Sequence, residues 1–241
     1  MPNSYFRFKQ FTIRHDKCAM KVGTDGVLLG AWANTEHANY ILDIGTGSGL
    51  IALMIAQRSQ AQIDAIDIDN GAYIQACENS EASPFAKQIN IYHQSLEDFA
   101  ATTNRRYDLI VSNPPYFIDS LKPPVEKRAL ARHTDSLRLN DLISHSLSIL
   151  SDNGRIALIL PYDQEKELVD ILTQEKLFII RQTNVIPVAG GSPKRILVEI
   201  TRKENLMFQK EELTIEIERH KYTSEYQTLT RDYYLDRSFF K

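Results

Sequence analysis

The stretch YILDIGTGSGLIALMIA, residues 40–56, decides the fold of this chain. Its first five residues form a short apolar run, glycines follow at positions 45, 47 and 49, and apolar residues then recur with helical spacing. A strand that turns through a glycine-rich loop into a helix is the first half of a βαβ unit. The loop also indicates a ligand site, because ligands of open α/β sheets bind where the strands end.

The same alternation continues along the chain. Strands are predicted at 62–68, 89–93, 107–112 and 154–160, and helices alternate with them, including one at 139–150 with Asn140 as its N-cap. Strands that alternate with helices predict an α/β fold with a mostly parallel sheet and helices on both faces. The apolar runs at 177–188 and 196–202 are joined by a short link, which predicts one antiparallel strand near the C-terminal end.

We expect one domain over residues 1–241. Residues 1–39 would form an N-terminal arm and cap segment, residues 40–203 the α/β core, and residues 204–241 a C-terminal extension. FRFKQFTI (6–13) predicts a hairpin or an extended arm, and TDGVLLGAWA (24–33) predicts a short helix. A strand at 213–217 and a helix in the aromatic tail are weaker expectations.

Composition narrows the class of protein. Hydrophobic residues make up 43% of the 241 residues and charged residues 24%, the balance of a globular protein. No apolar run reaches the length of a membrane span, and the first residues lack the apolar core of a signal peptide, so we expect a cytoplasmic protein. Cys18 and Cys77 do not make a disulfide framework, and His15-x-x-Cys18 lacks the second pair of ligands that a metal site needs. We therefore expect no membrane association and no metal, and no oligomeric partner is indicated.

Acidic residues stand around the glycine loop. Asp43 precedes the loop, where a carboxylate would repel a pyrophosphate but favour a cationic amino-acid ligand. Asp67 ends the second predicted strand, and an acid there can accept hydrogen bonds from both hydroxyls of a ribose, with Asp69 as the alternative. After the third strand, Glu97 or Asp98 is expected to meet the amino group of an adenine.

The second motif is VSNPPYF, residues 111–117, which ends the fourth predicted strand abruptly. Proline stops a buried strand because it has no backbone N–H and a fixed φ angle. In a sheet of this order the fourth strand lies beside the first, so residues 113–116 should open onto the same crevice as the glycine loop.

The glycine loop and the spaced acid together resemble the S-adenosylmethionine-dependent methyltransferases with a Rossmann-like sheet, over residues 40–200. The resemblance implies S-adenosylmethionine as cofactor and S-adenosylhomocysteine as product. The alternative is a tight strand-to-helix turn that carries surface aspartates. The positions that the resemblance assigns to the cofactor are Asp43, Gly45, Gly47, Gly49, Asp67, Ile68, Glu97, Asp98 and Asn113.

The residues NPPY match the (N/D)PPY motif of methyltransferases that act on planar –NH₂ groups, which implies catalytic roles for Asn113, Pro114, Pro115 and Tyr116. The side-chain oxygen of Asn113 and the carbonyl of Pro114 are two acceptors for the two N–H groups of such an amine. They would orient a nitrogen whose lone pair is otherwise delocalised. The ring of Tyr116 offers a face on which a planar substrate can stack.

The segment FKQFTIRHDKCAMKVGTDGVLLGAWA, residues 8–33, resembles the start of the bacterial tRNA1(Val) (adenine-37-N6)-methyltransferases, and the likeness continues through NPPYF, ARH and PKR. That family implies a tRNA partner and methylation of the adenosine 3′ of the anticodon. It also implies that Lys21, Thr24 and Asp25 help to close the cofactor pocket. A plain N-terminal cap helix is the alternative for this segment.

Other substrates remain open, because related enzymes methylate guanine N2 of rRNA, cytosine N4 of DNA or the glutamine amide of release factors. The release-factor enzymes usually carry a separate recognition domain, and only about 39 residues precede the first predicted strand, too few for one. A catalytically silent RNA-binding module is a further alternative. The intact glycines, Asp67 and NPPY argue against it.

The net charge of −3 counts mildly against nucleic acid, but the distribution of charge matters more than its sum. The link between the last two predicted core strands should lie at the carboxyl edge of the sheet, as should the long loop after NPPY. Basic groups from separate segments on one rim predict a phosphate-binding surface. The predicted RNA-binding residues are Tyr116, Lys122, Arg128, Arg132, His133, Lys194 and Arg195.

Overall fold

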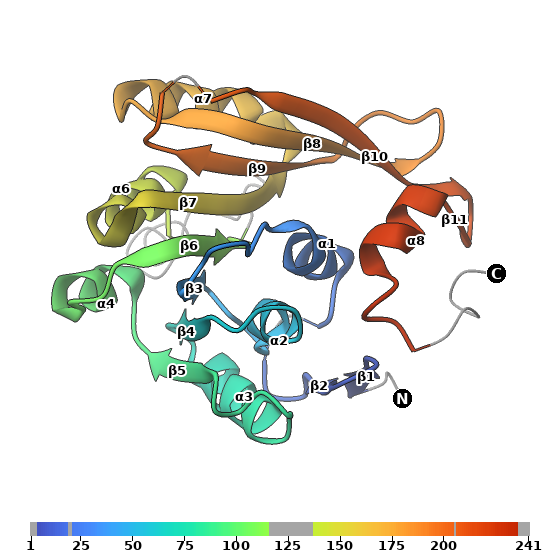
Figure 1. The fold of residues 1–241 in the computed structure, drawn as a ribbon. Helices are drawn as coiled ribbons and strands as arrows, with labels where there is room; N and C mark the ends of the chain where they lie inside the picture. The colour runs from blue at the N-terminus through green and yellow to red at the C-terminus, as the bar shows by residue number, and fades with distance from the viewer. Residues whose placement is uncertain (1–3, 19–20, 116–136, 205, 236–241) are drawn as a thin grey trace, which may run out of the picture.

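The structure is a computed structural model that describes residues 4–18, 21–115, 137–204 and 206–235. Within these ranges nine strands form one sheet in the order β11-β10-β8-β9-β7-β6-β3-β4-β5 (Figure 1). Its strands are β3 (Tyr40–Ile44), β4 (Gln62–Asp67), β5 (Ile89–His93), β6 (Tyr107–Ser112), β7 (Leu150–Pro161), β8 (Phe178–Val188), β9 (Arg195–Thr201), β10 (Gln209–Glu218) and β11 (Lys221–Tyr222).

The sheet is mostly parallel. Strand β9 runs antiparallel to both of its neighbours, β7 and β8, which confirms the predicted antiparallel strand. Strand β10 is parallel to β8, and the short strand β11 adds a second antiparallel edge that the sequence did not predict. Strands β5, β4, β3, β6 and β7 therefore all end at one edge of the sheet, as do β8 and β10.

Helices cover both faces of the sheet, as predicted. Helices α1, α2 and α8 contribute to one apolar cluster, whereas α4, α6 and α7 contribute to the other, and α3 lies beside β4, β5 and β2. The helices are α1 (Thr24–Trp32), α2 (Leu50–Ala56), α3 (Asn70–Glu81), α4 (Leu96–Thr102), α6 (Leu139–Ile149), α7 (Glu165–Gln174) and α8 (Ser224–Thr230).

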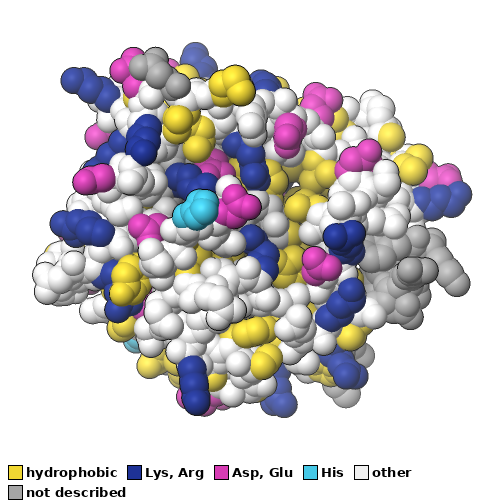
Figure 2. All heavy atoms as spheres, in the orientation of Figure 1, with side chains coloured by type: hydrophobic (Ala, Val, Ile, Leu, Met, Phe, Trp, Pro, Cys, Tyr) yellow, Lys and Arg dark blue, Asp and Glu magenta, His cyan; other side chains and the backbone are white. Residues whose placement is uncertain are grey.

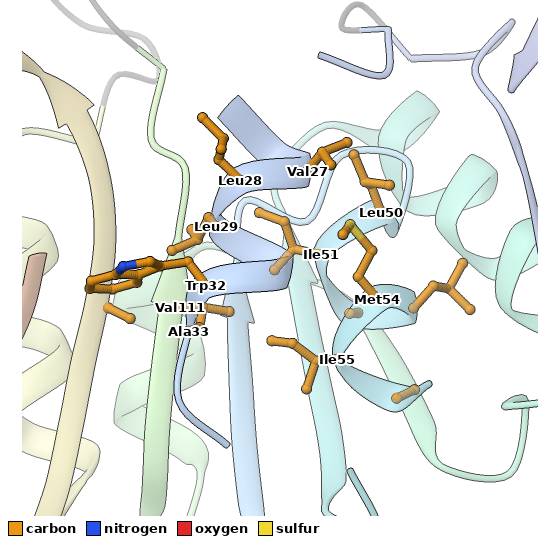
Figure 3. Close-up of a cluster of buried hydrophobic side chains, with 14 of the residues drawn as sticks. Val27, Leu28, Leu29, Trp32, Ala33, Leu50, Ile51, Met54, Ile55 and Val111 are labelled. Carbon is orange, nitrogen blue, oxygen red and sulfur yellow. The ribbon is translucent and has the colours of Figure 1, made fainter. Parts of the chain in front are cut away.

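The central strands are apolar at successive positions because both of their faces are buried. In β6, Leu109 and Val111 belong to the cluster under α1 and α2, whereas Ile110 belongs to the cluster on the opposite face. Side chains of α1, α2 and β6 meet in the first of these clusters (Figure 3). This packing fixes α1 over the middle of the sheet, with its first residues near the edge where the strands end.

The N-terminal arm forms the hairpin that was one of the two predicted alternatives. Strands β1 (Tyr5–Arg7) and β2 (Thr12–Arg14) pair antiparallel, and the predicted helix at 24–33 is α1. At the other end, Tyr226 of α8 and the later Tyr233 are buried in the cluster that includes α1. Part of the aromatic tail is therefore helical and packs on the body.

Three element boundaries differ from the expectations. Helix α6 begins at Leu139 with Arg138 as its N-cap residue, so the predicted cap at Asn140 is wrong. The Arg138 side chain bonds Asp141 in the first helical turn, 3.0 Å from Nε to Oδ2, and that acid suits the positive end of the helix dipole. Strand β7 starts at Leu150 and β10 at Gln209, each four residues earlier than predicted. Among the described residues, no helix has the length and apolarity to span a bilayer.

Candidate functional site

Three strand ends lie level at one edge of the sheet. Ile44 of β3 pairs with Ile66 of β4 on one side and with Ser112 of β6 on the other. Gly45, Asp67 and Asn113 are each the next residue along the chain. Because adjacent strands lie about 4.8 Å apart, this register brings the glycine loop, the ribose-binding candidate and the NPPY motif to one place.

The glycine loop is held open at its centre. Gly45 and Gly47 have φ angles of 68° and 57°, a left-handed conformation that favours glycine. A Cβ added at either position would meet no atom within 4 Å, so the described residues leave open space beside the loop. Gly49 precedes α2 and packs against Ala76 of α3, where an added Cβ would lie 3.5 Å from the Cα.

Asp43 lies beneath this loop and is fully buried. Its Oδ2 accepts a hydrogen bond from Thr46 Oγ1 at 2.6 Å and one from the backbone N–H of Ala52 at 3.2 Å. Oδ1 is buried without a hydrogen-bond partner among the described residues. Burial raises the pKa of Asp43 to about 7, against the effect of the two hydrogen bonds, and the nearby charge of Asp67 adds to the rise.

Asp67 and Asp69 have different roles. Asp67 Oδ2 accepts the backbone N–H of Gly47 at 2.8 Å, and its Oδ1 accepts the backbone N–H of Asp69 at 2.9 Å. Asp69 is instead the N-cap of α3, and its side chain accepts from Ala72 N at 2.7 Å. Burial raises the pKa of Asp67, although its hydrogen bonds to the backbone oppose the rise. Ile68 is 52% exposed and presents apolar surface beside Asp67.

The structure also separates the roles of the two acids after β5. Asp98 Oδ2 accepts the hydroxyl of Ser95 at 2.7 Å, and Ser95 caps α4 by accepting the backbone N–H of Asp98. Asp98 therefore belongs to the start of the helix. Glu97 is exposed in the same turn. The chain reaches this turn close to the ribose-binding candidate, because Gln94 N donates to Asp67 O at 3.1 Å.

The NPPY motif begins directly after β6. Ser112 Oγ donates to Ile44 O at 2.9 Å and so ties the end of β6 to the residue before the glycine loop. Asn113 is partly buried, Pro114 is buried and Pro115 is exposed. The predicted residues Tyr116, Lys122, Arg128, Arg132 and His133 lie outside the described residues.

The start of α1 lies near the glycine loop. An added Cβ at Gly26 would lie 3.0 Å from Leu50 Cδ2, and Leu50 immediately follows the loop. Lys21 and Thr24 are exposed, and Asp25 Oδ2 bonds Arg195 Nε at 2.8 Å. The exposed Lys194, by contrast, is held through its backbone, whose N–H donates to Val185 O at 2.9 Å. The predicted pair therefore differs, because Arg195 is partly buried and bonded to α1, whereas Lys194 is exposed.

Sequence reasoning missed two supporting residues on α3. Asn79 Nδ2 donates to Ser48 O in the glycine loop and to Arg14 O in the arm, each at 2.8 Å. Gln75 Oε1 accepts the backbone N–H of Lys17 at 2.9 Å. Both side chains are buried, and their spacing of one helical turn was the available signal. Among the described residues, no group of three or more His, Cys, Asp or Glu is placed to hold a metal ion.

Relatives of known family match the chain closely. A model of the methyltransferase small domain family matches residues 20–175. A tRNA1(Val) (adenine(37)-N6)-methyltransferase from Parabacteroides distasonis is 55% identical over 235 residues, which are 98% of this chain and 99% of that protein. One of the same name from Trichodesmium erythraeum is 47% identical over 238 residues, with 98% of this chain and 99% of that protein covered.

Solved structures with lower identity share the fold. A predicted O-methyltransferase from Agrobacterium tumefaciens has a TM-score of 0.68 at 17% identity and covers 87% of this chain and 96% of its own. A glycopeptide N-methyltransferase solved with S-adenosyl-L-methionine has a TM-score of 0.55 at 12% identity, covering 76% of this chain and 90% of its own. These likenesses establish a Rossmann-like methyltransferase sheet. The family match and the identity over nearly the whole length together show that this chain belongs to the methyltransferase small domain family and to the tRNA1(Val) (adenine(37)-N6)-methyltransferases.

Proposed function

We propose that the protein transfers a methyl group from S-adenosylmethionine to N6 of an adenine in tRNA, the adenosine 3′ of the anticodon of a valine tRNA. The observation that carries this proposal is the shared level of Gly45, Asp67 and Asn113 at the ends of three adjacent strands. That register puts the glycine loop beside the NPPY motif, which supports a cofactor and an amine bound side by side. The choice of base and RNA is supported by the name of a relative that is 55% identical over 98% of this chain.

The residues at the strand ends fit the cofactor. The open space beside Gly45 and Gly47 admits the ligand close to the backbone of the loop. Each oxygen of Asp67 accepts one backbone N–H and keeps a further lone pair for a ribose hydroxyl. The exposed side chain of Ile68 offers apolar contact to the adenine ring. Asp43 is buried below the loop and would favour the ligand's ammonium group through charge, because opposite charges attract strongly in a buried site.

The reaction needs an oriented amine. S-adenosylmethionine, when bound, supplies an electrophilic methyl group on a sulfonium. The side-chain oxygen of Asn113 and the carbonyl of Pro114 accept the two N–H groups of the substrate amine and direct its nitrogen. The methyl group would pass from the sulfonium, which would become a neutral thioether, to the nitrogen, and the nitrogen would lose one proton to solvent. The products are S-adenosylhomocysteine and the methylated amine.

We infer that tRNA reaches this edge from the side that carries Lys194, which is exposed. Arg195 contributes indirectly, because its bond to Asp25 holds the start of α1 near the glycine loop. The reaction as proposed uses no metal ion, since the amine is activated by hydrogen bonds alone. A tRNA substrate also implies a cytoplasmic enzyme.

The proposed function is tested with labelled methyl donor and three acceptors. These are a valine tRNA transcript, the same transcript with guanosine in place of the adenosine 3′ of the anticodon, and a release factor. Label on the first acceptor alone supports the proposal. Label on the guanosine transcript points to guanine N2 or to another position, and label on the release factor points to a glutamine amide. No label on any acceptor favours a silent RNA-binding module.

A further inference from the structure

A second concave site lies at the same edge of the sheet, away from the glycine loop. It is a pocket of about 330 Å³ lined by four aromatic side chains together with aliphatic ones such as Val27 and Ile215, and we call it the aromatic pocket. Its main lining residues are Phe6 of β1, Pro187 of β8, Glu216 of β10, Tyr222 of β11, Tyr226 of α8 and Tyr234. The segment that leads into α1 completes the wall with Gly23 and Thr24.

The aromatic pocket is separate from the cofactor site but lies on the catalytic side. Glu216 pairs with Val188 at the carboxyl end of β8, so the pocket opens where β8 and β10 end. Four strand spacings separate β10 from β6, or about 19 Å at about 4.8 Å each. Helix α1 packs against both α2 and α8 (Figure 1). Its first residue, Thr24, lines the aromatic pocket, and Gly26 lies close to Leu50 beside the glycine loop. A substrate that spans several nucleotides can therefore occupy both.

The chemistry of the walls suits a flat heteroaromatic ring. Tyr222 and Tyr226 have ring centroids 5.2 Å apart with planes inclined by 27°, and the rings of Phe6 and Tyr234 meet edge to face at 6.0 Å. Glu216 is the acidic member of the lining, and its carboxylate can accept an N–H from an exocyclic amine. Aromatic faces with one polar acceptor are the features by which proteins hold unpaired bases.

Charged side chains of both signs flank the residues that line the aromatic pocket. Arg7, Lys21 and Lys221 are exposed, and each is next in the chain to a lining residue. Lys221 pairs with Glu218. On the face that carries α1 and α8, acidic and basic side chains are otherwise mixed (Figure 2). The acids Asp25 and Glu225 are likewise next in the chain to lining residues, so the choice of occupant rests on the stacking surfaces and on Glu216.

We propose that the aromatic pocket binds an unpaired nucleobase of the RNA substrate, a few nucleotides from the adenine that is methylated. The identity of that RNA rests on the proposed function. The pocket supplies binding energy away from the reacting nitrogen, and it would help to choose an RNA loop over an isolated adenosine. Its occupant is a base with an exocyclic amine, because Glu216 provides an acceptor.

The first test replaces Tyr222, which is only partly buried, so that the fold is kept. Tyr222→Leu retains apolar volume without an aromatic face, and Tyr222→Phe retains the face. We expect Tyr222→Leu to raise the KM for tRNA about tenfold, within the range for loss of one stacked base, with kcat and the Kd for S-adenosylmethionine unchanged. Tyr222→Phe should behave as the wild type. An unchanged KM in Tyr222→Leu would overturn the proposal.

The second test asks whether a base is the occupant. Single abasic nucleotides are placed in turn at each anticodon-loop position other than the methylated one, in RNA for the wild type and for Tyr222→Leu. We expect one position where the abasic change weakens the wild type but adds nothing to the variant, since both remove the same contact. Additive effects at every position would exclude a base in the pocket. If the wild type methylates no tRNA, the proposed function fails. Binding of an RNA hairpin to the same variants, measured by fluorescence anisotropy, then still shows whether a base occupies the pocket.

Discussion

Asn113 shows how much a single position can contribute to the site. It is the first residue after β6, and Ser112 before it is tied to Ile44 beside the glycine loop by a hydrogen bond of 2.9 Å. The strand pairing therefore fixes the position of Asn113, and the two prolines after it restrict the backbone that follows. An acceptor held in this way orients a substrate amine without reorganisation during the reaction.

We expect Asn113→Ala to lower the rate of methyl transfer about 100-fold or more, the usual effect of losing one group that stabilises developing charge. Binding of S-adenosylmethionine, measured by calorimetry, should stay within a few-fold of the wild type. Asn113→Asp is the matched control, because it retains oxygen acceptors, and it should keep more activity than the alanine variant. Normal turnover by Asn113→Ala would contradict the proposed mechanism.

We predict that Asp43 makes cofactor binding depend on pH. Its pKa is raised to about 7 by burial in the ligand-free protein, above the ordinary value of 3.8. Because burial favours the protonated carboxyl, Asp43 stabilises the fold fully below about pH 4. This stabilisation is lost as the pH rises through about 7 and the carboxyl becomes charged. The ammonium group of the cofactor favours the charged form, so binding releases a proton below pH about 7.

The affinity for S-adenosylmethionine should accordingly increase from pH 5.5 to 7, by at most tenfold per pH unit, and level off above about 7. Calorimetry in buffers of different ionisation enthalpy measures the proton release directly. Asp43→Asn should bind more weakly and lose most of this pH dependence. An affinity that does not change with pH in the wild type would show that Asp43 stays ionised in the free protein.

At the same scale, the sequence could narrow the site but could not choose between neighbouring acids. It left Asp67 and Asp69 as alternatives, and the structure shows that Asp69 caps α3 while Asp67 holds Gly47. Asp98 is likewise used to start α4. Capping depends on where a helix begins to within one residue, which is the least certain part of a sequence pattern.

At the scale of elements, the connection from β8 to β9 joins the proposed RNA-binding residue Lys194 to helix α1 beside the glycine loop. The link ends with Lys194 exposed and Arg195 bonded to Asp25 at the start of α1. The short link between two apolar runs predicted this hairpin and placed its link at the carboxyl edge of the sheet. The pairing with Asp25 could not be predicted, because it joins residues that are far apart in the chain.

Since Arg195 also positions α1, a test of RNA binding should change Lys194 alone. We expect Lys194→Glu to weaken tRNA binding about 3- to 10-fold and to reduce its dependence on salt, because one phosphate contact is lost. Binding of S-adenosylmethionine should not change. Lys87→Glu is the control, since Lys87 is exposed just before β5 at the opposite edge and carries the same change of charge. Equal weakening by both variants would point to net charge rather than to this rim.

At the scale of the molecule, the sequence predicted the central sheet and its covering helices better than the outer parts of the fold. Alternating apolar runs predicted a covered parallel core, because strands buried on both faces are apolar throughout. The register of β10 against β8 could not be predicted, since a strand with charged residues such as Lys210 and Glu211 gives no clear pattern of burial. The arm was equally hard to place, because polar side chains of α3 hold its backbone.

We propose that the arm, the core and the C-terminal extension unfold as one unit. Trp32 lies before the core strands, and its Nε1 donates to Thr183 of β8 at 2.9 Å. Tyr233 lies after the core, and its hydroxyl donates to Met54 O of α2 at 3.2 Å. Both contacts are buried, so neither end can leave without exposing the cluster beneath α1 and α2.

Thermal unfolding should therefore show one midpoint by two probes. Trp32 is the one tryptophan of the chain, so its fluorescence reports on the contact between helix α1 and the core. Far-ultraviolet circular dichroism reports on the whole sheet. Saturating S-adenosylmethionine should raise both midpoints equally, because a ligand at 100 times its Kd adds about 2.7 kcal/mol to the stability of the unit that binds it. A fluorescence midpoint that stays behind while the dichroism midpoint rises would mean that α1 unfolds independently of the cofactor site, and the cap would then be a separate unit.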